Sequence, residues 1–286
     1  MGVGQRGIVI YMDITGNINT EDPIDTNKEV KKIYGKLFGS ALFDKVEFVL
    51  EDITKLFNGL YPSYAKCDTG YHDLEHTLQA YLATARIISG LVHEHPTAIS
   101  EEFVVLGLIS ALGHDTGYIR ERDDIEGKGG KYTQIHMNRS REFMGKYLSK
   151  LKYNLQQIQY VQNIISCTGL LINMLSIPFT SEMERKTGHI LGTADLIGQM
   201  SDPNYVEKLP KLYDEFNDGG VLGYKSAKDL IEKTPAFWEV IVMKRLKEDF
   251  HSVYQFAANY FEGNNCYITG VNRNIAQISQ RLLCKS

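Results

Sequence analysis

An apolar stretch, residues 106–112, leads through Gly113 into the adjacent pair His114-Asp115. Histidine supplies a neutral nitrogen donor and aspartate a hard oxygen donor, so two adjacent ligands can meet one metal ion if the chain bends there. A His-Asp dipeptide is common by itself, and its meaning depends on what other ligand-type residues the chain supplies. The pair therefore marks a candidate metal site.

Three further residues could join this pair. His72 and His76 are four positions apart, which on a helix turns both toward one cavity, although alone they are better explained as polar residues at a helix start. Asp195 lies in a small, apolar neighbourhood, where an unpaired carboxylate costs several kcal/mol. An arginine or a helix end could be its partner, but beside His114-Asp115 a metal ion is favoured.

The order of these residues, a histidine, then His-Asp, then a distant aspartate, resembles the HD-domain metal-dependent phosphohydrolase superfamily. Residues 71–76, Tyr-His-Asp-Leu-Glu-His, are similar to the Tyr-His-Asn-x-x-His motif of class I cyclic-nucleotide phosphodiesterases. The resemblance covers residues 40–260 and implies that His72 is the general acid that protonates the leaving alkoxide. It implies four ligands to a first metal ion: His76, His114, Asp115 and Asp195. Asp115 would also act in catalysis, by reaching toward a second metal through a bridging water or hydroxide.

The implied chemistry fits these residue types. A divalent metal can lower the pKa of bound water to about 7, and an imidazole with a pKa near 6.5 can protonate a leaving oxygen. A mixed nitrogen and oxygen site suits Zn, Mn, Fe, Co or Ni better than Mg, whereas a second ion held mostly by water could be Mg or Mn.

Residues after the His-Asp pair could complete the site. His136 begins its own predicted helix, in the region where two-metal members of the superfamily supply a ligand to the second ion; a capping or surface role is the alternative. Arg120, Lys131 and Arg139 are near in sequence and could clamp a phosphate, although loop charges are more often simply solvated.

The chain departs from the phosphodiesterase pattern in two places. Tyr118 stands where those enzymes have a further histidine. They also hold the purine with a C-terminal glutamine and a stacking phenylalanine, for which Gln255 and Phe256 are available as a weak match. These departures leave phosphohydrolase chemistry intact and weaken the case for a cyclic-nucleotide substrate.

Two alternatives share the scaffold. Di-iron oxygenases of the HD type normally add two further histidines before the last aspartate. This chain offers His136 and then only His189, which precedes Asp195 by six and so faces another side of the helix, while Cys167 stands where a histidine would be expected. A catalytically silent sensor or interaction domain would be expected to have lost a ligand, and all are present.

These residues need a scaffold to bring them together. Apolar residues recur at steps of three and four, without alternating strand patterns, which predicts an all-α fold. Helices are expected over residues 40–60, 73–90, 100–113, 136–151, 154–166, 181–197, 204–217, 235–261 and 271–283. We therefore expect an HD-domain, phosphodiesterase-like helical bundle over residues 40–286, preceded by a short N-terminal extension, residues 1–39, with a short strand at residues 8–12. The Gly-rich and charged residues 116–133 are long enough for a functional lid.

Composition bounds the remaining possibilities. The chain has 286 residues, 43% of them hydrophobic and 23% charged, with a net charge of −4, so bulk charge gives no reason to expect nucleic-acid binding. Its four cysteines form no Cys-x-x-Cys pair, and no apolar run reaches the length of a signal core or membrane span. We expect a cytoplasmic protein, with a small-molecule phosphoester or nucleotide as its partner, no membrane association, and a possible homodimer.

Overall fold

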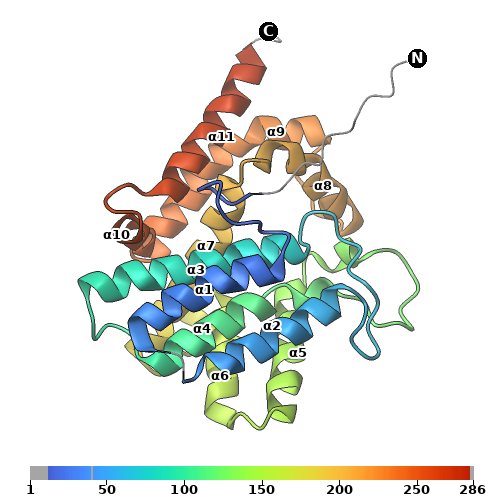
Figure 1. Ribbon diagram of the computed structural model, residues 1–286. Helices are drawn as coiled ribbons and strands as arrows, with labels where there is room; N and C mark the ends of the chain where they lie inside the picture. The colour runs from blue at the N-terminus through green and yellow to red at the C-terminus, as the bar shows by residue number, and fades with distance from the viewer. Residues whose placement is uncertain (1–11, 40, 284–286) are drawn as a thin grey trace, which may run out of the picture.

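The computed structural model describes residues 12–39 and 41–283, and in these ranges the chain is built from helices, with two isolated β-bridges and no strand (Figure 1). The predicted all-α class is confirmed. The α-helices are α1 (Pro23–Phe38), α2 (Phe43–Phe57), α3 (Leu74–Glu94), α4 (Glu101–Gly113), α5 (His136–Lys150), α6 (Leu155–Ser166), α7 (Glu182–Ser201), α8 (Tyr205–Asp218), α9 (Ala227–Ala236), α10 (Ala257–Tyr260) and α11 (Cys266–Leu283).

Helices α3 and α4 lie at the centre of the molecule. From Phe103 to Gly113 every residue of α4 is buried, and α3 is buried along most of its length, so neither has a polar face turned to water. A helix that is apolar all round is stable only when other helices cover it. Helices α1, α4, α7 and α10 pack against α3, and α2, α6 and α7 pack against α4.

Side-chain caps set where the helices near the candidate site begin. Asp73 caps α3 by accepting a hydrogen bond from the backbone N–H of His76, and Ser181 caps α7 in the same way. Asn154 and Gln157 form a reciprocal capping box at the start of α6. Such caps satisfy N–H groups that have no partner inside the helix, and each stabilises it by about 1 kcal/mol. The cap at Asp73 places His76 in the first turn of α3.

Residues 12–39 are part of the folded core. Helix α1 begins at Pro23 after an Asp22 cap, and buries Val30, Ile33 and Tyr34 against its neighbours. This helix was not expected, although an aspartate followed by proline is a typical helix start. Residues 8–11 of the expected strand lie outside the described residues, and Met12 forms only an isolated bridge with Asn19.

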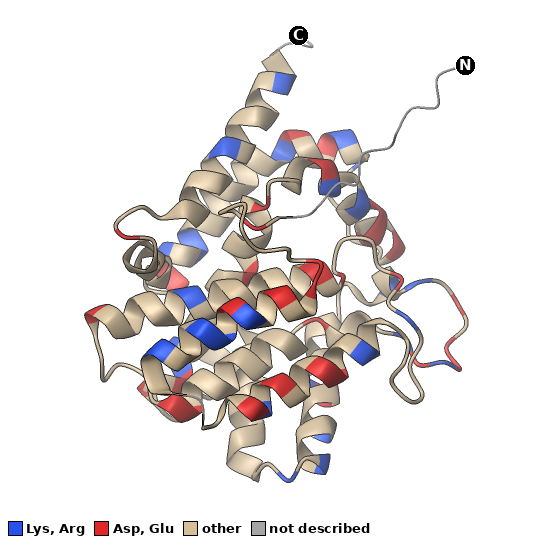
Figure 2. Cartoon of the chain, in the orientation of Figure 1, with Lys and Arg blue, Asp and Glu red and all other residues tan. Residues whose placement is uncertain are grey.

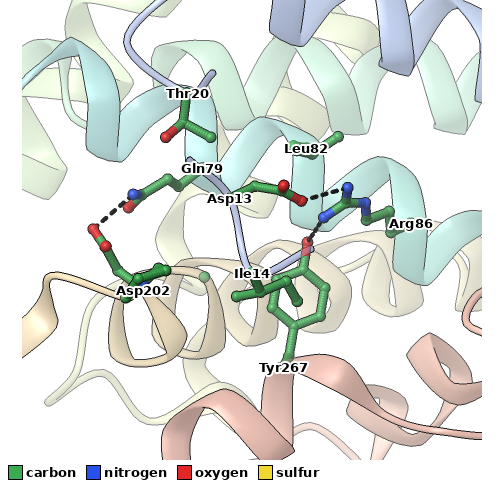
Figure 3. A pocket seen from close by; sticks show the side chains of 10 residues that line it. Asp13, Ile14, Thr20, Gln79, Leu82, Arg86, Asp202 and Tyr267 are labelled. Atoms are coloured by element: carbon green, nitrogen blue, oxygen red, sulfur yellow. Dashed lines mark hydrogen bonds and ion pairs between the residues drawn. The ribbon is translucent and has the colours of Figure 1, made fainter. Parts of the chain in front are cut away.

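A buried arginine ties both ends of the described chain to α3 (Figure 3). Arg86 on α3 pairs with Asp13 (2.7 Å) and donates a hydrogen bond to the hydroxyl of Tyr267 on α11 (3.2 Å). Two turns earlier on the same face of α3, Gln79 donates to Asp202, which follows α7 (2.8 Å). Arg86 is almost fully buried, so these contacts replace its lost hydration.

The predicted long helix over residues 235–261 is helical without a break only as far as Asp249. After α9 the chain continues through two π-helical segments, Phe237–Val242 and Arg245–Asp249. It then turns sharply at His251 and Ser252, whose φ angles of 50° and 59° are left-handed. Left-handed residues cannot continue a right-handed helix, so Val253–Phe256 forms a 3-10 turn and α10 runs in a new direction. The last helix, α11, begins earlier than expected, at Cys266.

Charges of both signs alternate on the outer faces of α1 and α2, and the segment between α4 and α5 is also charged (Figure 2). None of the described helices combines the length and apolar character needed to cross a bilayer.

Candidate metal centre

Three helices bring four of the predicted ligands to one point. His76 comes from the first turn of α3, His114 and Asp115 from the end of α4, and Asp195 from α7. These side chains are between 1% and 11% exposed. The two ligands of α4 follow its last buried turn, so the apolar helix acts as a rigid support for the polar pair.

The ligand atoms are spaced as a metal ion would require. The Nε2 atoms of His76 and His114 are 3.3 Å apart. The nearest carboxylate oxygens, Asp115 Oδ2 and Asp195 Oδ1, lie 3.1 to 3.6 Å from these nitrogens. Four ligands placed tetrahedrally at the usual zinc–nitrogen distance lie about 3.3 Å from one another. The five distances that involve an imidazole nitrogen thus match those around one divalent cation, and ligand atoms of His76, His114 and Asp195 all lie within 4.8 Å of one another.

Hydrogen bonding leaves these atoms available to an ion. His114 Nδ1 is 2.7 Å from the backbone oxygen of Ala111, which can only accept, so Nδ1 carries the proton and Nε2 of the neutral ring presents a lone pair. Asp115 Oδ2 is buried without a hydrogen-bond partner. In the described part of the chain, imidazoles rather than lysine or arginine are the ion-pair partners of both carboxylates.

The electrostatics of the cluster point the same way. Burial opposes protonation of His76, but hydrogen bonds and charge from Asp115 and Asp195 raise its pKa to about 9. Burial likewise opposes ionisation of Asp195, yet its contacts with the two imidazoles hold its pKa below the usual range. The two buried carboxylates therefore stabilise positive charge within the cluster, either as protons on the imidazoles or as a bound divalent cation.

His72 is held beside this cluster by a residue that the sequence analysis missed. Its Nδ1 donates to Glu215 Oε2 of α8 (2.5 Å), and Glu215 Oε1 accepts from the backbone N–H groups of Tyr71 and His72 (2.5 and 3.2 Å). Ligand-type atoms of His72, His76 and Asp115 lie within 4.8 Å of one another. Glu215 is a buried carboxylate on the apolar side of α8, near Leu212 and Phe216. A glutamate within the apolar stripe of an amphipathic helix was the feature of the sequence that could have identified it.

Tyr118 and His136 complete this side of the site. The Tyr118 ring stacks on the rings of His72 and His136, with centroid distances of 4.6 and 4.5 Å. His136 donates Nδ1–H to Thr133, which leaves Nε2 3.8 Å from Asp115 Oδ1, and burial lowers its pKa. A neutral His136 and the second oxygen of Asp115 could both ligate a second ion.

Close packing explains how His136 reaches Asp115. Gly117 lies against the start of α5, and a Cβ atom at this position would stand 1.9 Å from the backbone oxygen of His136. No other residue fits here, because that distance is far below van der Waals contact. The 3-10 turn Thr116–Tyr118 can therefore bring α5 directly against the end of α4.

A second support, also missed, lies behind Asp195. Gln199, one turn later on α7, donates to Asp195 Oδ1 (3.1 Å) and accepts from the hydroxyl of Tyr71 (2.8 Å). This chain of hydrogen bonds links the Asp195 carboxylate to the loop that carries His72. Such outer contacts fix the orientation of a ligand and tune its basicity.

The predicted phosphate-binding cations are engaged with the protein itself. Arg120 pairs with Asp68 (2.8 Å), and Lys131 pairs with Asp124 (2.5 Å). Arg139 donates to the backbone oxygens of residues 117 and 119 and stacks on the ring of Tyr132. These contacts hold the segment between α4 and α5 in place. In this structure the three cations therefore bind protein oxygens and are not directed at a phosphate site.

The predicted purine clamp is not near the cluster. Phe256 packs against His95 and the backbone of Gly90, at the C-terminal end of α3, and Gln255 is exposed. His76 lies in the first turn of the same helix, about 20 Å away at 1.5 Å per residue. The structure thus does not bring Gln255 and Phe256 together with the other site residues.

His189 also stays apart from the cluster. Its ring contacts the rings of Phe179, Phe250 and His251. Burial, together with nearby His251, lowers its pKa to about 4. His189 and Asp195 leave α7 on different sides, as their six-residue spacing predicts, and His189 therefore does not reach the cluster.

Comparison with protein-family models matches residues 24–280 to the Npun_R2479-like family, and the chain belongs to that family. The match contains every residue of the cluster as well as Glu215 and Gln199. No curated protein matches the chain.

Proposed function

We propose that this protein is a metal-dependent phosphohydrolase with an HD-type helical bundle, which cleaves a phosphodiester or another nucleotide-type phosphoester. The observation that carries the proposal is a set of four buried ligand atoms, two from imidazoles and two from carboxylates, in which each imidazole nitrogen lies 3.1 to 3.6 Å from the other three atoms. His72 beside them supplies a proton donor that neither a structural metal site nor a core would need.

The residues present fit a transition metal better than Mg. Two neutral imidazoles and two carboxylates are the ligand types of Zn, Mn, Fe, Co or Ni, and Asp115 with His136 could hold a second ion such as Mg or Mn. Such an ion supplies a nucleophilic water at neutral pH. His76, His114, Asp115 and Asp195 would hold the first ion.

The protein's own residues would handle the leaving group. Because Nδ1 of His72 is committed to Glu215, the other ring nitrogen is the one that can give a proton to the leaving oxygen. As the new P–O bond to water forms, the P–O bond to the leaving alkoxide breaks. The proton lost from the water balances the proton that His72 gives, so the products are a phosphomonoester and an alcohol.

The structure favours this reading over the two alternatives. A di-iron oxygenase would need further histidines at the cluster, and His189 contacts Phe250 and His251 instead. A silent binding domain would not need His72 to be oriented by a buried glutamate. A cyclic-nucleotide specificity gains no support, because Gln255 and Phe256 lie elsewhere.

The test is metal analysis of the purified protein followed by hydrolysis of bis-p-nitrophenyl phosphate, with and without added Mn. We expect bound transition metal and diester cleavage. The His72→Ala variant should keep its metal and lose roughly 10²- to 10⁴-fold in its rate on an alkyl diester, whose leaving alkoxide needs a proton from the general acid. His95→Ala, an exposed histidine at the far end of α3, is the matched control and should change neither quantity. Absence of metal under every supplement, or an unchanged rate of alkyl-diester hydrolysis in His72→Ala, would contradict the proposal.

A further inference from the structure

A groove of about 510 Å³ opens to solvent over the C-terminal half of α3, between α1 and α10. Its floor is one face of α3, where Arg86, Ser89 and His93 follow one another at steps of three and four residues. Both α1 and α10 pack on α3 and supply walls of the groove (Figure 1). Small-molecule sites usually have volumes of roughly 300–1,000 Å³, so this groove has the size of a binding site.

Contacts inside the protein hold the walls of the groove in place. The turn that begins at Asp13 forms one wall, and the ion pair between Asp13 and Arg86 (2.7 Å) ties this turn to α3. On the other side, Asn259 of α10 donates to the backbone oxygen of Gly90 (3.3 Å). The two helices meet closely there, because a Cβ atom at Gly90 would stand 1.7 Å from the backbone oxygen of Phe256. The groove is therefore a fixed part of the fold, as small-molecule sites usually are.

The lining of the groove has more cationic than anionic side chains. Its one carboxylate among the described residues is Glu29, which is shared between the Lys32 ammonium (3.0 Å) and the hydroxyl of Tyr260 (2.9 Å). Lys36, one turn after Lys32 on α1, has no acidic partner in the described part of the chain. Exposed His93 on the floor likewise makes no hydrogen bond or ion pair with any described residue. An anion in the groove can therefore be bound from both sides without displacing a contact of the fold.

Two aromatic rings form the remaining wall. Tyr260 and Phe261, where α10 ends, line the groove with partly exposed rings whose centroids are 4.8 Å apart. Arg86 packs against both rings, with its guanidinium carbon 5.5 and 5.3 Å from their centroids. Because Asp13 neutralises Arg86, the arginine supports the rings and leaves the binding of an anion to Lys36 and His93. Partly exposed rings offer a surface on which a planar group can stack.

We propose that this groove binds a small organic anion in which a planar ring is joined to a phosphate group, the class to which nucleoside monophosphates belong. Lys36 and His93 contact the phosphate oxygens, and the ring lies against Tyr260 and Phe261. Inorganic phosphate would leave the aromatic wall unused, and a neutral ring would leave the two polar side chains without a partner. The site is separate from the metal centre and independent of the proposed hydrolysis, because His93 lies about 25 Å further along α3 than His76.

The test is isothermal titration calorimetry of the full chain with adenosine monophosphate (AMP). We expect the wild type to bind AMP, and Lys36→Ala and His93→Ala each to bind it about tenfold more weakly, because each variant loses a hydrogen bond to a charged group. Lys31→Ala is the matched control. Lys31 is an exposed lysine of the same helix, but it pairs with Glu47 of α2, outside the groove, so its loss should not change the affinity for AMP. Thermal unfolding of all variants shows that they are folded.

Further titrations separate the groove from the metal centre and the ring from the phosphate. Asp195→Asn, which removes a ligand of the proposed metal site, should retain the AMP binding that Lys36→Ala weakens. Binding that is lost in Asp195→Asn and unchanged in Lys36→Ala would place AMP at the metal centre and overturn this inference, while the phosphohydrolase would stand. Adenosine and inorganic phosphate should each bind at least tenfold more weakly than AMP. Equal affinities for phosphate and AMP, or no binding of AMP by the wild type, would also overturn the inference.

Discussion

Two clusters of buried charge lie along α3, and they are balanced in different ways. Around Arg86, each charge has a partner of opposite sign: Asp13 pairs with Arg86, while Lys208 pairs with Glu75 and Asp202. Around His76, two carboxylates face imidazoles, and positive charge is present only if protons or a cation are added. Both clusters are withdrawn from water, so the difference is one of composition and not of exposure.

This difference separates a structural cluster from the cluster that we propose to be a metal site. A cluster that contains its own arginine and lysine does not need an added ion, whereas a cluster of carboxylates and imidazoles depends on the protons or cations that it binds. A count of buried polar residues would not distinguish them, because both contain several. The following experiments test the comparison, in order of decreasing effect.

Removing Arg86 should give the largest loss of stability. Arg86→Met leaves the Asp13 carboxylate buried without its partner, and breaking a buried pair in this way costs about 3–5 kcal/mol. Urea unfolding with saturating metal measures the change. Adding Asp13→Leu should restore most of the loss, because the uncompensated charge is then gone. A double variant as unstable as Arg86→Met would contradict mutual neutralisation.

Removing metal should cost somewhat less, and only through the His76 cluster. A ligand present at 100 times its Kd stabilises the folded state by about 2.7 kcal/mol, so chelation should lower the unfolding free energy of the wild type by a similar amount. Asp195→Asn should abolish this dependence on metal. Asp202→Asn, in the other cluster, should lower stability equally with and without metal. If Asp195→Asn still responded to chelation, the ion would be bound elsewhere.

The smallest effect is expected at Glu215. Glu215→Gln should retain metal and lower kcat roughly tenfold, since the amide can still contact His72 but holds it less well for proton transfer. The loss should be greater for an alkyl diester than for a p-nitrophenyl diester, whose leaving group needs no proton. An equal loss for both substrates would indicate that Glu215 acts only on the local structure.

The helical scaffold was predictable where periodicity and caps coincide. Asn154 and the stripe of Val161 and Ile165 located α6 almost to the residue, because a local capping box and burial on one face act together. The break at His251 and Ser252 was not predictable. Their left-handed backbone lies inside a continuous apolar pattern, and long-range packing decides it.

For the candidate site, ligand types could be found in sequence and their supports could not. His114-Asp115 and Asp195 stand out because charged residues follow or interrupt apolar runs. Glu215 and Gln199 are ordinary polar residues on amphipathic helices, and only the packing of α8 and α7 brings them to His72 and Asp195. The loop cations had the right types, but their partners within the same loop could not be deduced from spacing.

The contacts of Arg86 have a consequence for the order in which the chain can fold. Its partners are Asp13 and Tyr267, and the second of these lies 181 residues further along the chain. Closing so long a loop is slow, and contacts of this range form late. During synthesis, α3 can meet Asp13 early but must wait for α11 before Arg86 gains all its contacts. We therefore expect the helix that carries His76 to become rigid only when the chain is nearly complete.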